Sequence, residues 1–119
     1  MSRVLLVDDG DILLRVVSRK LSALGCSVTG ETDVGSALRF VADGCTIFDV
    51  VLTDYHLPDG NGADLARALE GHLPVVLFAG DLNAVPQAHR DLFAACFSKL
   101  DSLDLVGARL AQLSQTREP

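Results

Sequence analysis

The sequence is poor in residue types that define several classes of protein. Its 119 residues include no tryptophan, one tyrosine and three cysteines, and no two cysteines form a Cys-x-x-Cys pair. An odd, scattered set of cysteines argues against a disulfide framework or a zinc ribbon and is typical of the reducing cytoplasm. The longest charge-free apolar stretch, residues 73–80, is far shorter than the roughly 18 residues of a membrane span. We therefore expect a cytoplasmic protein that does not enter the membrane.

Basic residues are also scarce, because ten Lys and Arg stand against sixteen Asp and Glu, for a formal net charge of -6. Such a surface repels phosphate backbones, which argues against direct binding of nucleic acid. Hydrophobic residues make up 49% of the chain, which is typical of a chain with a packed core rather than of a disordered one. We expect one domain over residues 1–119, with a loose C-terminal tail over residues 114–119.

Short apolar runs alternate with helical patterns along the chain. The runs predict strands over residues 4–7, 26–30, 50–52, 75–78 and 96–97. The intervening patterns predict helices over residues 14–24, 33–42, 63–70, 86–94 and 103–113. Alternation of this kind produces right-handed crossovers and a parallel sheet with helices on both faces. The sequence therefore predicts a three-layer α/β fold, flavodoxin-like, with a five-stranded parallel sheet in the order 2-1-3-4-5.

Charged side chains follow three of these strands at their carboxyl ends. Asp8 and Asp9 follow the first strand, Asp54 follows the third, and Lys99 follows the fifth. The first and third strands are neighbours in the predicted order, so the three carboxylates converge at one edge of the sheet. Unpaired carboxylates would repel one another, and a hard cation such as Mg²⁺ relieves that repulsion through oxygen ligands. The pattern predicts a site for a divalent metal ion.

Asp54 is the best candidate for a nucleophile, because it closes an apolar strand that holds it rigidly at the crevice. A carboxylate oxygen can attack phosphorus and form an aspartyl phosphate. The metal ion and Lys99 would neutralise the oxygen charges of the transferred group. Acids at strand ends can also merely cap helices or solvate loops, and Asp11 is most simply a residue of that kind.

With these residues the sequence resembles the receiver domain of bacterial two-component response regulators over nearly all of its length. The matching segments are residues 4–9, 49–54, 57–60, Gly62, 74–77 and Lys99. The resemblance implies that Asp54 is the phosphoacceptor and that Asp8, Asp9, Asp54 and the main-chain carbonyl of His56 bind Mg²⁺. It also implies that the main-chain amides of His56 and Gly80 contact phosphoryl oxygens, and that Lys99 takes part in catalysis.

The function implied by the resemblance is that of a stand-alone receiver in a phosphorelay. A histidine kinase or a histidine phosphotransfer protein would donate the phosphoryl group, and the domain would signal to a protein target through its fourth helix, fifth strand and fifth helix. Such a domain is a signalling phosphoacceptor and not an enzyme. A phosphatase with an aspartate nucleophile fits poorly, because it needs a second acid where this chain has His56. A flavodoxin also fits poorly, because residues 8–11 would repel the phosphate of the flavin.

Three positions depart from the family pattern. Ala79 stands in place of the usual threonine or serine, Cys96 in place of an aromatic residue, and Leu100 in place of the proline after the lysine. A cis peptide bond before a residue other than proline costs about 2.5–4 kcal/mol, so we expect a trans Lys99–Leu100 peptide and a changed loop path. We therefore expect Asp54 to be phosphorylated without a hydroxyl–aromatic switch. The same departures support a second hypothesis, a binding module that works without phosphorylation.

Two histidines lie close to this region of the sequence. His56 follows Asp54 by two positions, and exposure in the loop explains it most simply. His89 falls on the predicted fourth helix, where we expect it to face solvent.

Overall fold

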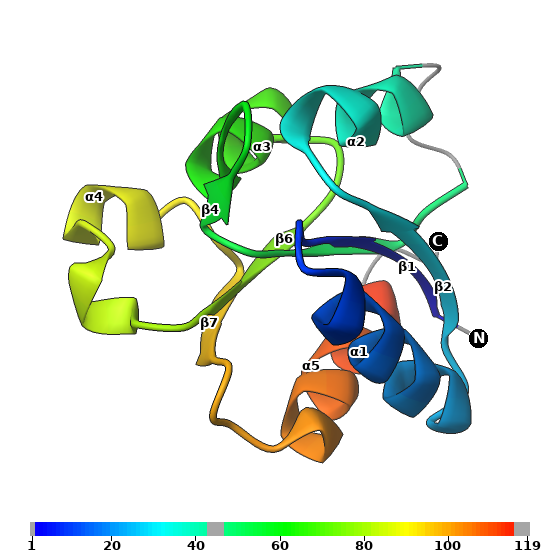
Figure 1. The fold of residues 1–119 in the computed structure, drawn as a ribbon. Coiled ribbons are helices and arrows are strands. Elements are labelled where there is room, and N and C mark those ends of the chain that lie inside the picture. Colours follow the sequence, from blue (N-terminus) through cyan, green and yellow to red (C-terminus); the bar gives the residue numbers. More distant parts are fainter. Residues whose placement is uncertain (1, 43–46, 116–119) are drawn as a thin grey trace.

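The computed structural model describes residues 2–42 and 47–115. Five strands form one parallel sheet (Figure 1), and its order is β2-β1-β3-β6-β7. The strands are β1 (Arg3–Val7), β2 (Ser27–Glu31), β3 (Val50–Thr53), β6 (Val75–Ala79) and β7 (Ala95–Ser98). The predicted order 2-1-3-4-5 is therefore confirmed, with the least apolar strand, β2, at an edge. The sequence also suggests Gly44 as the stop for the helix predicted over residues 33–42, but Gly44 and Cys45 lie outside the described residues.

Helices cover both faces of the sheet. Figure 1 shows α1 and α5 on one face and α2 and α3 on the other, with α4 beyond the β7 edge. The helices are α1 (Asp11–Ala23), α2 (Val34–Val41), α3 (Gly62–Ala68), α4 (Gln87–Arg90) and α5 (Leu103–Gln115), with a 3₁₀ turn, η1, over Leu82–Ala84. Each helix of the part of the chain that is described is too short or too polar to cross a membrane.

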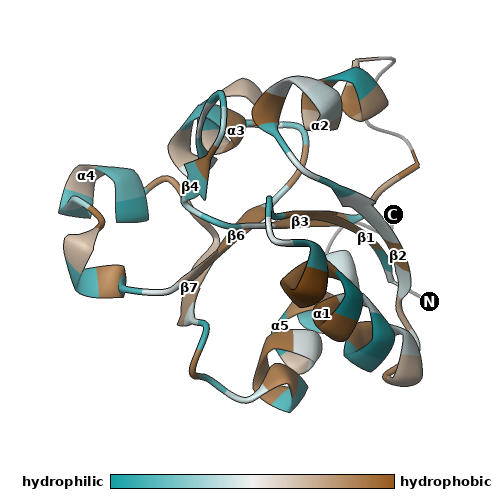
Figure 2. Ribbon diagram, in the orientation of Figure 1, coloured by the Kyte–Doolittle hydropathy of each residue, from teal (hydrophilic) through white to brown (hydrophobic). Residues whose placement is uncertain are grey.

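The central strands are apolar on both faces because each face packs against helices. In β1, Leu5 and Val7 pack into the core under α2 and α3, whereas Val4 and Leu6 pack into the core under α1 and α5. Figure 2 shows the same pattern, with hydrophobic colour along the central strands. Full burial of one such side chain contributes about 1.5–3 kcal/mol, so the two cores fix the strands that carry the acidic residues.

Two predicted segments differ from the structure between β3 and β7. The expected loop after β3 contains a small antiparallel pair, β4 (His56–Leu57) and β5 (Gly60–Asn61). The helix predicted over residues 86–94 is confined to α4, with Pro86 as its N-cap. It ends early because the Ala94 amide donates to the Val75 carbonyl, 2.9 Å away, and so starts the pairing of β7 with β6.

The C-terminal helix also extends further than the sequence suggested. Ser114 and Gln115, which we placed in a loose tail, belong to α5. The Ser114 side chain is buried, and its hydroxyl donates to the Leu110 carbonyl at 2.9 Å. Residues 116–119 lie outside the described residues.

Candidate functional site

The register of the sheet brings the predicted carboxylates together. Val7 of β1 pairs with Thr53 of β3, so Asp8 and Asp54 leave adjacent strands at the same level. The Asp54 amide donates to the Val7 carbonyl at 2.9 Å, which continues this pairing by one residue. One carboxylate oxygen from each of Asp8, Asp9 and Asp54 lies within 4.8 Å of the other two. Asp8 is buried, Asp54 is half-buried and Asp9 is exposed, so the cluster opens to solvent on the Asp9 side.

Lys99 joins this cluster from the fifth strand of the sheet. Its ammonium nitrogen lies 3.0 Å from Asp8 Oδ2 and 3.0 Å from Asp54 Oδ2. Burial by itself lowers the pKa of Lys99, but hydrogen bonds to the two carboxylates outweigh burial and raise that pKa above its usual value. The group therefore stays charged between its two partners.

The path of the loop after Lys99 matters because Leu100 replaces the usual proline. The Lys99–Leu100 peptide is trans, as expected, and no peptide bond among the described residues is cis. The Lys99 amide donates to the Ala79 carbonyl at 2.8 Å, which holds the lysine main chain beside β6. The lysine side chain consequently reaches Asp54 without a proline in the loop.

The two inner carboxylates are oriented by main-chain donors as well as by the lysine. Asp8 Oδ1 accepts a hydrogen bond from the Gly10 amide at 2.8 Å. Asp54 Oδ1 accepts one from the Tyr55 amide at 2.7 Å. The Asp9 carboxylate takes no side-chain hydrogen bond from the described residues. Asp8 and Asp54 are thus held in place, while Asp9 keeps its oxygens available.

The loop that follows Asp54 is fixed from two sides. A Cβ atom at Gly62 would lie 2.6 Å from the Asp54 carbonyl oxygen, so only glycine allows this close approach. The Asp59 carboxylate accepts hydrogen bonds from the amides of Val34 and Gly35, at 2.8 and 2.9 Å, at the start of α2. Gly62 and Asp59 therefore have a structural role, since their contacts hold the loop beside the site.

A cavity of about 250 Å³ lies next to the carboxylates. It is lined by Asp54, Tyr55, His56, Ala79, Gly80, Asp81, Ala84, Val85 and Lys99. Ala79 presents only a methyl group to it, and the Cys96 thiol lies 3.7 Å from the Arg90 carbonyl oxygen. Neither residue supplies the hydroxyl or the aromatic ring usual at these positions. The cavity is large enough for a small anionic group beside Asp54.

A contact that the sequence did not suggest links the site to α4. The Tyr55 hydroxyl and His89 Nδ1 share a hydrogen bond of 2.6 Å. The prediction that His89 faces solvent is therefore wrong, because His89 is half-buried against Tyr55. The two residues are 34 positions apart and belong to no common motif, so no sequence pattern pointed to the pair. His56, by contrast, is exposed as expected.

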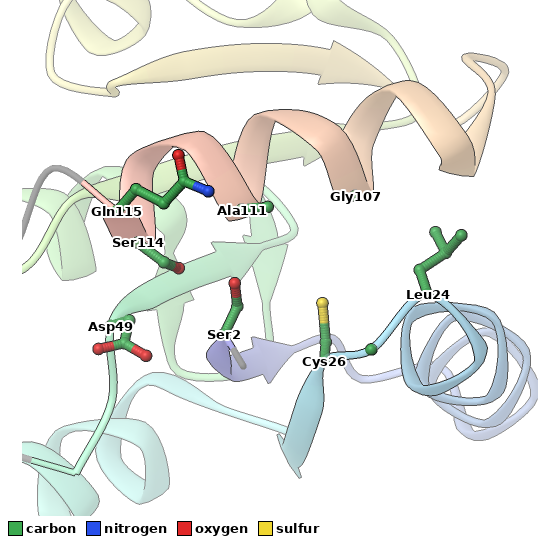
Figure 3. A pocket seen from close by; sticks show the side chains of 9 residues that line it. Ser2, Leu24, Cys26, Asp49, Gly107, Ala111, Ser114 and Gln115 are labelled. Atoms are coloured by element: carbon green, nitrogen blue, oxygen red, sulfur yellow. The ribbon is translucent and has the colours of Figure 1, made fainter.

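A second cavity, of about 230 Å³, lies at the amino ends of the strands (Figure 3). Ser2, Cys26 and Ser114 contribute side chains to it, and burial raises the pKa of the Cys26 thiol. Its one carboxylate, that of Asp49, pairs with Arg3 at 3.3 Å. This cavity therefore has none of the clustered charge found around Asp54.

Comparisons with known proteins agree with this arrangement. Residues 4–95 match the family model described as the response regulator receiver domain. Two-component response regulator ORR27 from Oryza sativa subsp. japonica is 32% identical over 94 residues, which are 78% of this chain and 15% of that protein. Chemotaxis protein CheY from Pseudomonas aeruginosa is 34% identical over 85 residues, which cover 66% of this chain and 67% of that protein.

Solved structures share the fold at lower sequence identity. A receiver domain protein from Clostridium thermocellum superposes with a TM-score of 0.85 at 21% identity, covering 98% of this chain and 97% of that one. The response regulator TrrA from Thermotoga maritima, in complex with Mg(2+)-BeF, gives a TM-score of 0.85 at 18% identity, over 95% of this chain and 99% of that one. The sequence match spans Asp8, Asp9 and Asp54, which this fold brings together. The chain therefore belongs to the response regulator receiver domain family.

Proposed function

We propose that this chain is a phosphoacceptor in a two-component phosphorelay, with Asp54 as the residue that receives the phosphoryl group. The observation that carries the proposal is the position of Asp54 Oδ2, 3.0 Å from the Lys99 ammonium group, which also contacts Asp8. The phosphoryl donor is a histidine kinase or a histidine phosphotransfer protein, as suits a member of this family.

The transfer is a displacement at phosphorus. An oxygen of the Asp54 carboxylate forms a bond to phosphorus while the bond from phosphorus to the donor imidazole nitrogen breaks, and that nitrogen keeps the electron pair. Lys99 offsets negative charge on the phosphoryl oxygens, and the main-chain amides of His56 and Gly80 donate hydrogen bonds to them. All three residues line the cavity next to Asp54, which supports this assignment.

The donor set around Asp54 fits a magnesium ion, since it consists of carboxylate oxygens and one of its acids faces solvent. Asp8, Asp9, Asp54 and the main-chain carbonyl of His56 would hold the ion. When bound, Mg²⁺ supplies positive charge that stabilises the transferred phosphoryl group. TrrA from Thermotoga maritima, which shares this fold, forms a complex with Mg(2+)-BeF, and this supports Mg²⁺ as the ion.

We assign the signalling output to protein contacts of α4, β7 and α5, with residues 1–119 acting as a stand-alone receiver. The match covers 67% of a chemotaxis protein, which favours this proposal, whereas it covers 15% of the much longer response regulator ORR27. The chemistry of the chain is then limited to its own phosphorylation and dephosphorylation.

A second candidate function is a protein-binding module that does not depend on phosphorylation. Ala79 and Cys96 favour it, because neither can form the usual hydroxyl–aromatic pair. The intact carboxylate cluster and its contact with Lys99 favour the phosphoacceptor.

One experiment separates the two functions. Incubation with acetyl phosphate and Mg²⁺, followed by intact-mass measurement, should add the mass of one phosphoryl group to the wild-type chain. The increment should vanish in Asp54→Asn and after removal of Mg²⁺ with a chelator. It should persist in the control Asp104→Asn, whose carboxylate pairs with Lys20 on the surface. A wild-type chain that gains no mass, or an Asp54→Asn chain that still gains it, contradicts the phosphoacceptor proposal.

A further inference from the structure

We infer that the hydrogen bond between Tyr55 and His89 carries the phosphorylation state of Asp54 to helix α4, in place of a hydroxyl–aromatic switch. The inference rests on the proposed function and names the route by which that function reaches the surface of the molecule.

Tyr55 is connected at both of its ends. Its amide donates to Asp54 Oδ1 at 2.7 Å, and its hydroxyl shares the 2.6 Å hydrogen bond with His89 Nδ1. The residue is buried, with 9% of its surface exposed, and it borders the cavity next to Asp54. A single residue thus contacts both the acceptor carboxylate and α4.

Helix α4 depends on contacts of this kind. It has only four residues, and so short a helix is not stable in isolation. Val85 before it and Phe93 after it are buried in the core, whereas Pro86, Gln87 and Ala88 are exposed. Among the described residues, the bond to Tyr55 is the one side-chain hydrogen bond between α4 and the loop next to Asp54. Loss of this bond therefore weakens the attachment of the middle of α4, where the contact between the Tyr55 and His89 rings remains.

Phosphorylation alters the Asp54 carboxylate, which accepts the hydrogen bond from the Tyr55 amide. Both oxygens of Asp54 are engaged, Oδ1 by the Tyr55 amide and Oδ2 by Lys99. Formation of the aspartyl phosphate, a mixed anhydride, on either oxygen requires the hydrogen bond to that oxygen to be remade. The amide of His56, which belongs to the Tyr55–His56 peptide, then turns towards the phosphoryl oxygens, and the whole peptide moves with it.

A small displacement is enough to break the outer bond. A hydrogen bond of 2.6 Å is lost when its partners separate by about 1 Å. The cavity next to Tyr55, lined by Ala79 and Val85, gives the ring room to move because no threonine or serine fills that side. Phosphorylated Asp54 thus releases α4, and the unphosphorylated chain holds it.

The test is hydrogen exchange over residues 86–93, measured on phosphorylated and unphosphorylated chains whose state is fixed by intact mass. In the wild type, phosphorylation should accelerate exchange by about 2- to 10-fold, the effect of losing one hydrogen bond. Tyr55→Phe keeps the ring and removes the hydroxyl, so its unphosphorylated form should already exchange at the fast rate and phosphorylation should add nothing.

Variants of the histidine distinguish a hydrogen bond from simple packing. His89→Asn keeps an acceptor near the position of Nδ1 and should retain the response, whereas His89→Leu should lose it. His72→Ala, a change outside α4 and the site, should behave like the wild type. Two results would overturn this inference and leave the phosphoacceptor role intact, provided that the mass increment is normal. One is a Tyr55→Phe chain whose exchange still responds to phosphorylation as the wild type does. The other is a wild-type chain whose exchange does not respond to phosphorylation. Absence of the mass increment overturns the proposed function itself, and with it the release of α4.

Discussion

The Lys99 ammonium group lies 3.0 Å from Asp54 Oδ2, and the same nitrogen lies 3.0 Å from Asp8 Oδ2. One cation thus holds two carboxylates that leave neighbouring strands. Two unit charges no more than 4.8 Å apart repel by at least roughly 3 kcal/mol at an effective dielectric constant of 20, so the lysine offsets a repulsion between these carboxylates. The contact also places a positive charge beside Asp54 Oδ2, and both residues line the cavity.

Replacement of Lys99 by methionine removes that charge while keeping most of the side-chain volume. We expect phosphorylation of Lys99→Met by acetyl phosphate to be about 10- to 100-fold slower, since a hydrogen bond to a charged group contributes about 1.5–3 kcal/mol. The rate is measured as mass increment against time. Lys20→Met is the matched control, because Lys20 pairs with Asp104 on the surface. Equal rates for the two variants would show that the lysine contact has no part in the transfer.

Magnesium binding should stabilise the folded chain. At a concentration about 100 times the dissociation constant, a ligand that binds only the folded state adds about 2.7 kcal/mol, which is visible as a rise in Tm. Asp9→Asn should lose most of that rise, because Asp9 is the exposed member of the cluster and keeps its oxygens available. Asp11→Asn, two positions along the chain and outside the cluster, should keep it. A full magnesium-dependent rise in Asp9→Asn contradicts the predicted ligand set.

The sheet and the carboxylate cluster could be predicted from the sequence because the signals are local. Uninterrupted apolar runs such as residues 4–7 and 75–78 indicate strands covered on both faces, and the fold rule then brings their carboxyl ends together. The positions of Asp8, Asp9 and Asp54 relative to one another follow from strand order alone. No long-range detail of packing was needed for that part of the site.

The features that the sequence did not reveal depend on contacts between distant segments. The Tyr55–His89 bond joins residues with no shared periodicity, and one tyrosine in a loop gives no pattern to read. The short α4 has the same origin, since its end is set by pairing of Ala94 with Val75 and not by a helix-stop residue. The position of Pro86, which suits the first turn of a helix, suggested a helix running to about Ala94, and strand pairing overrode it.

A separate prediction concerns the start of α2 and its dependence on pH. The Asp33 carboxylate accepts a hydrogen bond from the Ser36 amide at 2.7 Å, and that bond lowers the pKa of Asp33 below its usual value of 3.8. A lowered folded-state pKa means that the stabilisation is present above the unfolded-state pKa and is lost as pH falls through the folded-state value. Asparagine caps a helix without titrating, so Asp33→Asn is the reference variant.

The difference in Tm between the wild type and Asp33→Asn should be constant near neutral pH. As pH falls below about 3.8, the Tm of the wild type should fall relative to that of Asp33→Asn. Thermal unfolding followed by circular dichroism at a series of pH values measures it. A difference that does not change across this acidic range would mean that the ionised carboxylate adds nothing to the cap.

Ala79 offers a direct test of the missing hydroxyl. Its side chain is buried, and it borders the cavity next to Asp54, so a larger β-branched residue has space and suits its place at the end of β6. In Ala79→Thr the added hydroxyl can donate to a phosphoryl oxygen, which should slow decay of phosphorylated Asp54 by about 2- to 10-fold, the effect of one hydrogen bond.

Ala79→Val is the matched control for that experiment, because valine has the shape of threonine without the hydroxyl. After removal of acetyl phosphate, the fraction of chain that carries the phosphoryl mass is followed with time for the wild type and both variants. Slower decay in Ala79→Thr alone assigns the effect to the hydrogen bond. Equal slowing in both variants would assign the slower decay to exclusion of water from the filled cavity. The small side chain of Ala79 would then reduce the lifetime of phosphorylated Asp54 in the wild type, because it leaves the cavity open to water.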